Sequence, residues 1–163
     1  MVYVSMGHAI DEFAQRYPQH RLEISKRPAP IANFVADGGP LPGAESQGYF
    51  AEVFSRSPHA LFRVGPFQKE WEAAFAAEMR TISGLFGHDH RNWYWRDVVT
   101  GYLPSHVAEA GWRCVRVSDV QLPDSYPGDN FSIVLSNSSH SRITGTGTSW
   151  VEAFDEAVGA ASS

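Results

Sequence analysis

Histidine and acidic side chains are the residue types here that could bind a metal ion. His88 and His90 flank Asp89, and imidazole and carboxylate groups are common metal ligands. Side chains two positions apart diverge in a helix or a loop, and the sequence offers no obvious third ligand. A polar connecting segment is the favoured interpretation, so we expect no metal site and no cofactor.

A second possible site combines Cys114 with His59 and His140. A neighbouring imidazole can act as the base that activates a thiol nucleophile. Cys114, however, lies in the apolar run from Trp112 to Val117, where a free cysteine is usually a small buried hydrophobic residue. Each histidine lies beside an expected turn, which explains it without chemistry. A small enzyme with a site between the two halves of the chain is therefore an alternative, and we favour a non-enzymatic protein.

A glycine- and threonine-containing segment could bind phosphate. Residues 145–148 read Gly-Thr-Gly-Thr and precede a helical pattern, and helix N-termini bind anions. The segment lacks the Gly-Lys-Ser/Thr ending of a P-loop, and no downstream acidic residue is placed to bind a ribose. A tight connection from strand to helix, which requires small residues, is the favoured interpretation.

Acidic and aromatic side chains form the candidate partner-binding surface. The acidic ones lie on the polar face of an expected C-terminal helix and in the loop from 118 to 128, or just after it. Clustered aromatic residues supply binding energy at protein interfaces, although they also stabilise packing within a protein. The predicted set is Trp93, Tyr94, Trp95, Asp124, Asp129, Glu152, Asp155 and Glu156.

Composition restricts the function classes. The chain has 163 residues, of which 43% are hydrophobic, and it carries a net charge of −5. Residues 1–85 hold nine acids and eight bases, net −1, and residues 86–163 hold nine acids and five bases, net −4. A general nucleic-acid surface requires clustered Lys and Arg, so we expect no direct nucleic-acid binding. The start has no basic segment followed by an apolar run, and no stretch could span a membrane, which favours a cytoplasmic protein.

An internal similarity organises these residues. Residues 50–59 and 131–140 are identical at five of ten positions, namely Phe, Val, Ser, Ser and His. Further along, Trp-x-x-Ala-Phe occurs at residues 71–75 and again at 150–154. Because both blocks occur in the same order, we favour a duplicated unit over chance similarity.

Each copy has the pattern helix, strand, strand, strand, helix. In the first copy, helices are expected near residues 6–17 and 71–85, and strands near 21–24, 49–54 and 61–64. In the second, Ser149 and Glu152 form a capping box that fixes the start of the last helix. The prediction is an α+β fold, a tandem duplication with antiparallel sheets and helices packed on one face of each. The units are residues 1–86 and 87–163, joined in one compact body.

The second copy resembles small phage-encoded proteins of the phage ABA-sandwich type. The resemblance is carried by Gly-Trp-x-Cys-Val at residues 111–115, by residues 130–135, and by Gly-x-Gly-Thr-x-x-x-Glu-Ala-Phe-x-x-Ala-Val at residues 145–158. It covers about half the chain and implies a phage or prophage origin, without catalytic residues.

The order of elements also resembles a double-stranded-RNA-binding domain. Such a domain needs basic residues where this sequence has Glu152, Asp155 and Glu156.

These patterns lead to one main functional hypothesis. We expect a phage or mobile-element protein that binds and inhibits a host protein by steric and electrostatic blocking. We expect the target to be part of a nucleic-acid-handling defence complex, as for an anti-CRISPR-like inhibitor in the bacterial cytoplasm. A homodimer of the protein itself is a further expectation. A small-ligand sequestering protein that uses the long loops 26–47 and 118–128 is a further alternative.

Overall fold

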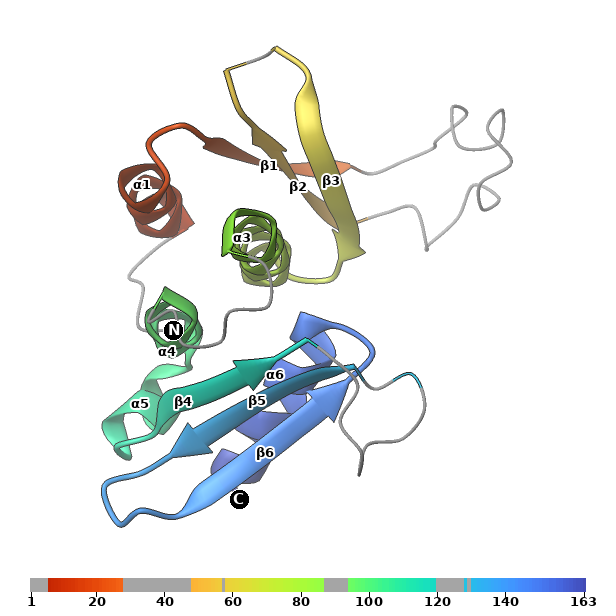
Figure 1. The fold of residues 1–163 in the computed structure, drawn as a ribbon. Coiled ribbons are helices and arrows are strands. Elements are labelled where there is room, and N and C mark those ends of the chain that lie inside the picture. Colours follow the sequence, from red (N-terminus) through yellow and green to blue (C-terminus); the bar gives the residue numbers. More distant parts are fainter. Residues whose placement is uncertain (1–5, 28–47, 57, 87–93, 120–127, 129) are drawn as a thin grey trace. The chain divides into compact units, whose positions relative to one another are not determined.

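A computed structural model of the chain describes residues 6–27, 48–56, 58–86, 94–119, 128 and 130–163. The first copy of the pattern comprises α1 (Met6–Arg16), β1 (Arg21–Arg27), β2 (Gly48–Phe54), β3 (Ala60–Phe67) and α3 (Glu70–Phe86). Its strands form one antiparallel sheet in the order β1-β2-β3, with α1 and α3 on the same side of it (Figure 1).

Helix α1 forms because its apolar residues recur with helical spacing. Ala9, Phe13 and Tyr17 are buried, and the rings of Phe13 and Tyr17 lie 4.7 Å apart between centroids. The helix ends just before Pro18, since a residue preceding proline disfavours helical backbone angles. The predicted first helix is therefore confirmed.

The sheet of this copy has one apolar and one charged row of cross-strand neighbours. Leu22 lies opposite Val53, and both are buried. One position along, Glu52 lies opposite Arg63 and pairs with it at 3.4 Å between Oε2 and Nη2. Successive side chains of a strand point to opposite faces, so this sheet has a core face and a polar face.

The second copy repeats the same order of elements. It comprises α4 (Tyr94–Tyr102), a short α5 (Ser105–Glu109), β4 (Arg113–Ser118), β5 (Phe131–Ser136), β6 (Arg142–Gly147) and α6 (Trp150–Ala161). The strands form a second antiparallel sheet in the order β4-β5-β6, with α6 behind it (Figure 1). The predicted α+β fold, with two three-stranded antiparallel sheets and helices packed on them, is confirmed.

Aromatic contacts join the elements of this second copy. The ring of Trp150 at the start of α6 lies 5.3 Å from Trp95 of α4 and 4.9 Å from Phe131 of β5, between centroids. Ile133 and Leu135 of β5 and Phe154 of α6 are almost completely buried. This core fixes α4 and α6 against the sheet.

Two glycines of β6 allow α6 to approach the sheet closely. A Cβ atom on Gly145 would lie 2.2 Å from the Ala153 carbonyl oxygen and 2.4 Å from the Ala157 nitrogen. A Cβ on Gly147 would lie 2.5 Å from the Cβ of Glu152. The predicted tight connection is therefore placed wrongly, because both glycines lie within β6 and not after it. Small residues are required here for another reason, namely the close packing of α6 on the strand.

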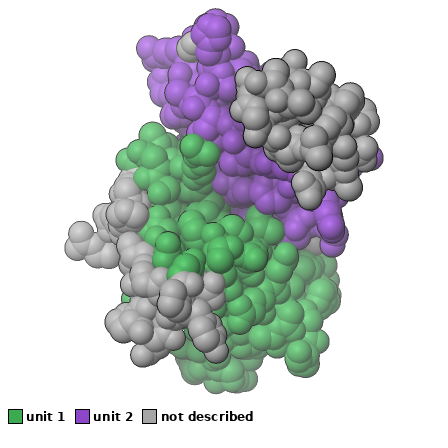
Figure 2. All heavy atoms as spheres, turned by 90° about the vertical axis from the view of Figure 1, so that its right-hand side faces the viewer, with its two compact units in different colours: residues 1–4, 78–163 green, residues 5–77 purple. Residues whose placement is uncertain are grey.

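The chain divides into two compact units, unit 2 (residues 5–77) and unit 1 (residues 1–4 and 78–163), coloured in Figure 2. The division falls within α3, whereas the sequence places a boundary after residue 86. Residues of α3 bond within unit 1: the Tyr102 hydroxyl donates to Glu78 at 3.3 Å, and the Ser83 hydroxyl donates to Asp119 at 3.3 Å. That the chain forms one compact body stays a prediction.

Among the described residues, no helix combines the length and the apolar character that crossing a membrane requires.

Candidate functional site

Three carboxylates project from the exposed face of α6, and we call Glu152, Asp155 and Glu156 the α6 acidic face. All three are exposed. Two of them are also held in place by β6 and the residue that follows it. The Thr146 backbone N–H donates to Glu156 Oε2 at 3.1 Å, and the Thr148 backbone N–H donates to Glu152 Oε2 at 2.7 Å.

The bond from Thr146 covers a sheet edge, and the bond from Thr148 covers the backbone just after the strand. β6 is an edge strand of its sheet, and edge strands expose backbone N–H groups that can pair with another chain. Glu152 and Glu156 are four residues apart, hence neighbours on the helix surface, and they match the two-residue spacing of Thr146 and Thr148. Sequence reasoning placed the acids on the polar face but missed these acceptor roles, because the pairing requires α6 to lie along β6.

The N-terminus of α6 is occupied by the chain's own groups. The Ser149 hydroxyl accepts from the Glu152 backbone N–H at 3.2 Å, which confirms half of the expected capping box. The Glu152 carboxylate accepts from the hydroxyl and the backbone N–H of Thr148 instead of from the N-cap residue itself. These two hydrogen bonds, the hydroxyl one first, lower the pKa of Glu152 below its ordinary value. A carboxylate therefore stands beside the position that a phosphate would need, which disfavours the phosphate-binding interpretation.

The aromatic candidates divide between core and undescribed segments. Trp95 is 0% exposed and packs against Trp150, so its side chain is inaccessible to a partner. Trp95 is buried because it lies on the side of α4 that faces the sheet. The sequence did not reveal which side of α4 faces the sheet, because the helix is short and its apolar spacing is irregular. Tyr94 is the first residue of α4, and its side chain is outside the described part of the molecule. Three further candidates lie wholly outside the described residues, namely Trp93, Asp124 and Asp129.

Cys114 is a buried residue of β4. Its burial raises the pKa of the thiol to about 12, against smaller opposing effects from the Arg116 backbone and the charge of Arg96. At neutral pH the thiol is protonated, and the thiolate is the nucleophilic form. This geometry disfavours the catalytic role considered for Cys114.

The histidine candidates lie in turns or outside the described residues. His140 is exposed at the β5–β6 turn with a φ of 64°, and the Asn137 side chain fixes that turn by accepting from the backbone N–H groups of Ser139 and Ser141, both at 3.0 Å. His59 is exposed just before β3. His88, Asp89 and His90 lie outside the described residues. Within the described ranges, no three His, Cys, Asp or Glu side chains are grouped so that they could hold a metal ion.

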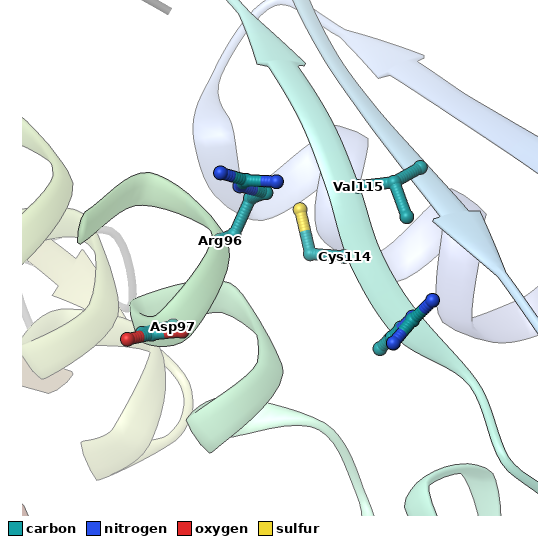
Figure 3. Close-up of a pocket in the computed structure, with 5 residues that line it drawn as sticks. Arg96, Asp97, Cys114 and Val115 are labelled. Carbon is teal, nitrogen blue, oxygen red and sulfur yellow. The ribbon is translucent and has the colours of Figure 1, made fainter. Parts of the chain in front are cut away.

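A pocket of about 310 Å³ lies beside Cys114 in unit 1. Arg96 and Asp97 of α4 and Arg113, Cys114 and Val115 of β4 line it. Figure 3 shows the guanidinium of Arg96 and the sulfur of Cys114 close together between helix and strand. The Thr100 hydroxyl of α4 accepts from the Cys114 backbone N–H at 3.0 Å, which holds α4 against β4 at this place.

No family model, no curated protein and no solved structure matches the chain.

Proposed function

We propose that this chain is a non-enzymatic phage or mobile-element protein that binds a host protein and inhibits it by steric and electrostatic blocking. The docking surface is the α6 acidic face, and the partner presents Lys and Arg side chains, as a nucleic-acid-handling defence complex in the bacterial cytoplasm does. The phage origin rests on the sequence resemblance of residues 111–158.

The observation that carries the proposal is the preorganisation of these carboxylates. Glu152 and Glu156 each use Oε2 for the bonds to β6 and Thr148, and Oε1 of neither residue bonds to any described residue. A carboxylate accepts several hydrogen bonds, so each keeps capacity for a guanidinium or ammonium donor. A fixed side chain loses less conformational entropy on binding than a mobile one, which favours association.

Charge supports the same surface. The three carboxylates follow one another over five residues of α6, whose described residues include no Lys or Arg. An acidic patch of this kind accelerates the encounter with a basic partner and makes the association sensitive to salt. The buried, protonated thiol of Cys114 weakens the enzymatic alternative.

The proposal is tested by capturing partners from a bacterial lysate with the purified chain and with two charge variants. Asp155→Lys reverses the charge at the centre of the α6 acidic face without removing the two carboxylates that cover β6. Glu109→Lys makes the same charge change at an exposed position of α5 and is the matched control.

We expect a protein that is captured by the wild type and by Glu109→Lys but is lost with Asp155→Lys and at raised salt. The activity of that protein should fall when the wild-type chain is added. Equal capture by both variants, or a captured protein whose activity is unaffected, would contradict the proposal.

A further inference from the structure

We propose that the pocket between α4 and β4 is a binding site for a small oxyanion, a phosphate or carboxylate group, which Arg96 and Arg113 hold between them. This site is separate from the α6 acidic face and does not depend on the protein partner.

The pocket has the size and the wall chemistry of such a site. Its volume of about 310 Å³ lies at the lower end of the range of about 300–1,000 Å³ that is usual for small-ligand sites. At about 30 Å³ for each water molecule, this volume equals roughly ten waters, which is enough for a phosphate monoester or an aromatic carboxylate. Val115 and the neutral thiol of Cys114 supply apolar wall beside the charged groups.

The guanidinium groups come from two different elements. Arg96 belongs to α4 and Arg113 to β4, and both side chains are exposed. Neither forms a hydrogen bond or an ion pair with any other described residue. A guanidinium presents a planar set of donors that matches the two oxygens of a carboxylate or phosphate. Both arginines line one pocket, and the proposal assigns the oxygens of the oxyanion to their donors.

The electrostatic balance of the pocket also favours an anion. Among the described residues, its lining holds two arginines and one aspartate, net +1, in a chain whose net charge is −5. Figure 3 shows the guanidinium of Arg96 beside the sulfur of Cys114, and both residues line the pocket. Asp97 lines the same pocket and opposes anion binding, so its removal should strengthen binding.

The site is held by packing rather than by a flexible loop. The bond between the Thr100 hydroxyl and the Cys114 backbone N–H ties α4 to β4 next to the pocket. Val98 and Val99 of α4 and Val117 of β4 are buried, so both elements are anchored in the core of unit 1. Because both elements are anchored, the ordering that accompanies binding is confined to the arginine side chains.

The test is a calorimetric titration of the full chain with inorganic phosphate and, separately, with benzoate, in a buffer of low ionic strength. Arg96→Gln and Arg113→Gln each remove one guanidinium. Arg142→Gln, at the exposed start of β6, removes the same charge away from the pocket and is the matched control. Asp97→Asn removes the opposing charge, and the circular dichroism of every variant checks that it is folded.

We expect one saturable site for at least one probe. Each pocket arginine variant should weaken binding at least about tenfold, since paired guanidinium contacts are lost, while Arg142→Gln stays within about twofold. Asp97→Asn should tighten binding, a gain that unfolding cannot imitate. Binding of phosphate alone identifies a phosphorylated ligand, and binding of benzoate alone identifies a carboxylate with an apolar body.

Three results would overturn the inference. One is the absence of any binding of either probe at concentrations up to about 10 mM. Another is an equal loss in Arg142→Gln and in the pocket variants, which would indicate general charge attraction. The third is a folded Arg96→Gln or Arg113→Gln chain that binds as tightly as the wild type.

Discussion

At the scale of single residues, the contact between Gly145 and α6 shows how closely side-chain volume is matched to packing. The strand glycine faces Ala153 and Ala157, and a methyl group on Gly145 would overlap the helix backbone. Interiors are packed densely enough that an added carbon shifts neighbouring atoms. The distance between β6 and α6 is thus set by the absence of a side chain.

Gly145→Ala should destabilise the protein by about 1–3 kcal/mol, because α6 must move away from β6. The matched control is Gly159→Ala in α6, where an added Cβ meets no atom within 4 Å. That control should stabilise the protein by about 0.5–1 kcal/mol through the higher helix propensity of alanine. Urea unfolding of both variants measures the two changes, and a neutral Gly145→Ala would refute the packing argument.

Cys114 gives a second prediction at this scale. Burial raises the pKa of its thiol from 9.0 to about 12, so above pH 9 the unfolded chain loses this proton and the folded chain keeps it. The folded state then binds more protons than the unfolded state, and the free energy of unfolding must fall as the pH rises through this window. The limiting slope is about 1.4 kcal/mol per pH unit.

Between pH 9 and about 11, the free energy of unfolding of Cys114→Ala should fall less steeply with pH than that of the wild type, whatever the stability of the variant at pH 7. Urea unfolding at each pH measures this free energy. If it falls equally in both proteins, the thiol ionises as easily in the folded as in the unfolded chain, and the prediction is wrong.

Several of these residue roles could be predicted from the sequence, and others could not. Ser149 and Glu152 indicate a helix start because a cap is a local interaction, and Gly145 indicates a need for a small residue. Trp95 could not be assigned to the core, since an exposed aromatic cluster and a buried one have the same composition. Arg96 and Arg113 were missed because they line one pocket only after α4 packs on β4.

At the scale of elements, both edges of the β4-β5-β6 sheet have backbone N–H groups covered by helix side chains. Thr100 of α4 accepts from Cys114 on β4, while Glu152 and Glu156 of α6 accept from Thr148 and from Thr146 on β6. Covering an edge prevents unwanted pairing with other strands. The two acids therefore stabilise the fold of unit 1, and their carboxylates remain exposed.

This pairing predicts which backbone amides exchange faster with solvent in each variant. Glu156→Ala should accelerate hydrogen exchange at Thr146, because its N–H loses the carboxylate acceptor, with a smaller effect at Thr148. Glu152→Ala should show the reverse, so that each variant is the control for the other. NMR measures the exchange of both amides. A change that is equal at both amides, or absent at both, would contradict the pairing of each carboxylate with its own backbone N–H.

At the scale of the whole molecule, the two copies share an order of elements and differ in surface. Aligned on the Trp-x-x-Ala-Phe motif, Glu152, Asp155 and Glu156 of α6 correspond to Ala73, Ala76 and Ala77 of α3. Ala73 and Ala77 are completely buried, whereas the three acids are exposed. The acidic face is thus a property of the second copy alone, which agrees with the net charge of −4 on residues 86–163.

The repeated order of elements could be predicted, because residues 50–59 recur in part at 131–140 and Trp-x-x-Ala-Phe recurs after both blocks. The division of the chain within α3 could not, since α3 is one uninterrupted helical pattern and the bonds of Glu78 and Ser83 to unit 1 form only in the folded chain.

The central claim, that a host protein docks on the α6 acidic face, is tested most directly by site-specific photo-crosslinking in bacterial cells. A photoreactive amino acid replaces Asp155 in one chain and Glu109 in the other. The account predicts a discrete covalent adduct with a host protein from position 155 and none with that protein from position 109. An adduct from position 109 alone, or none from position 155 in a folded and expressed chain, would contradict it.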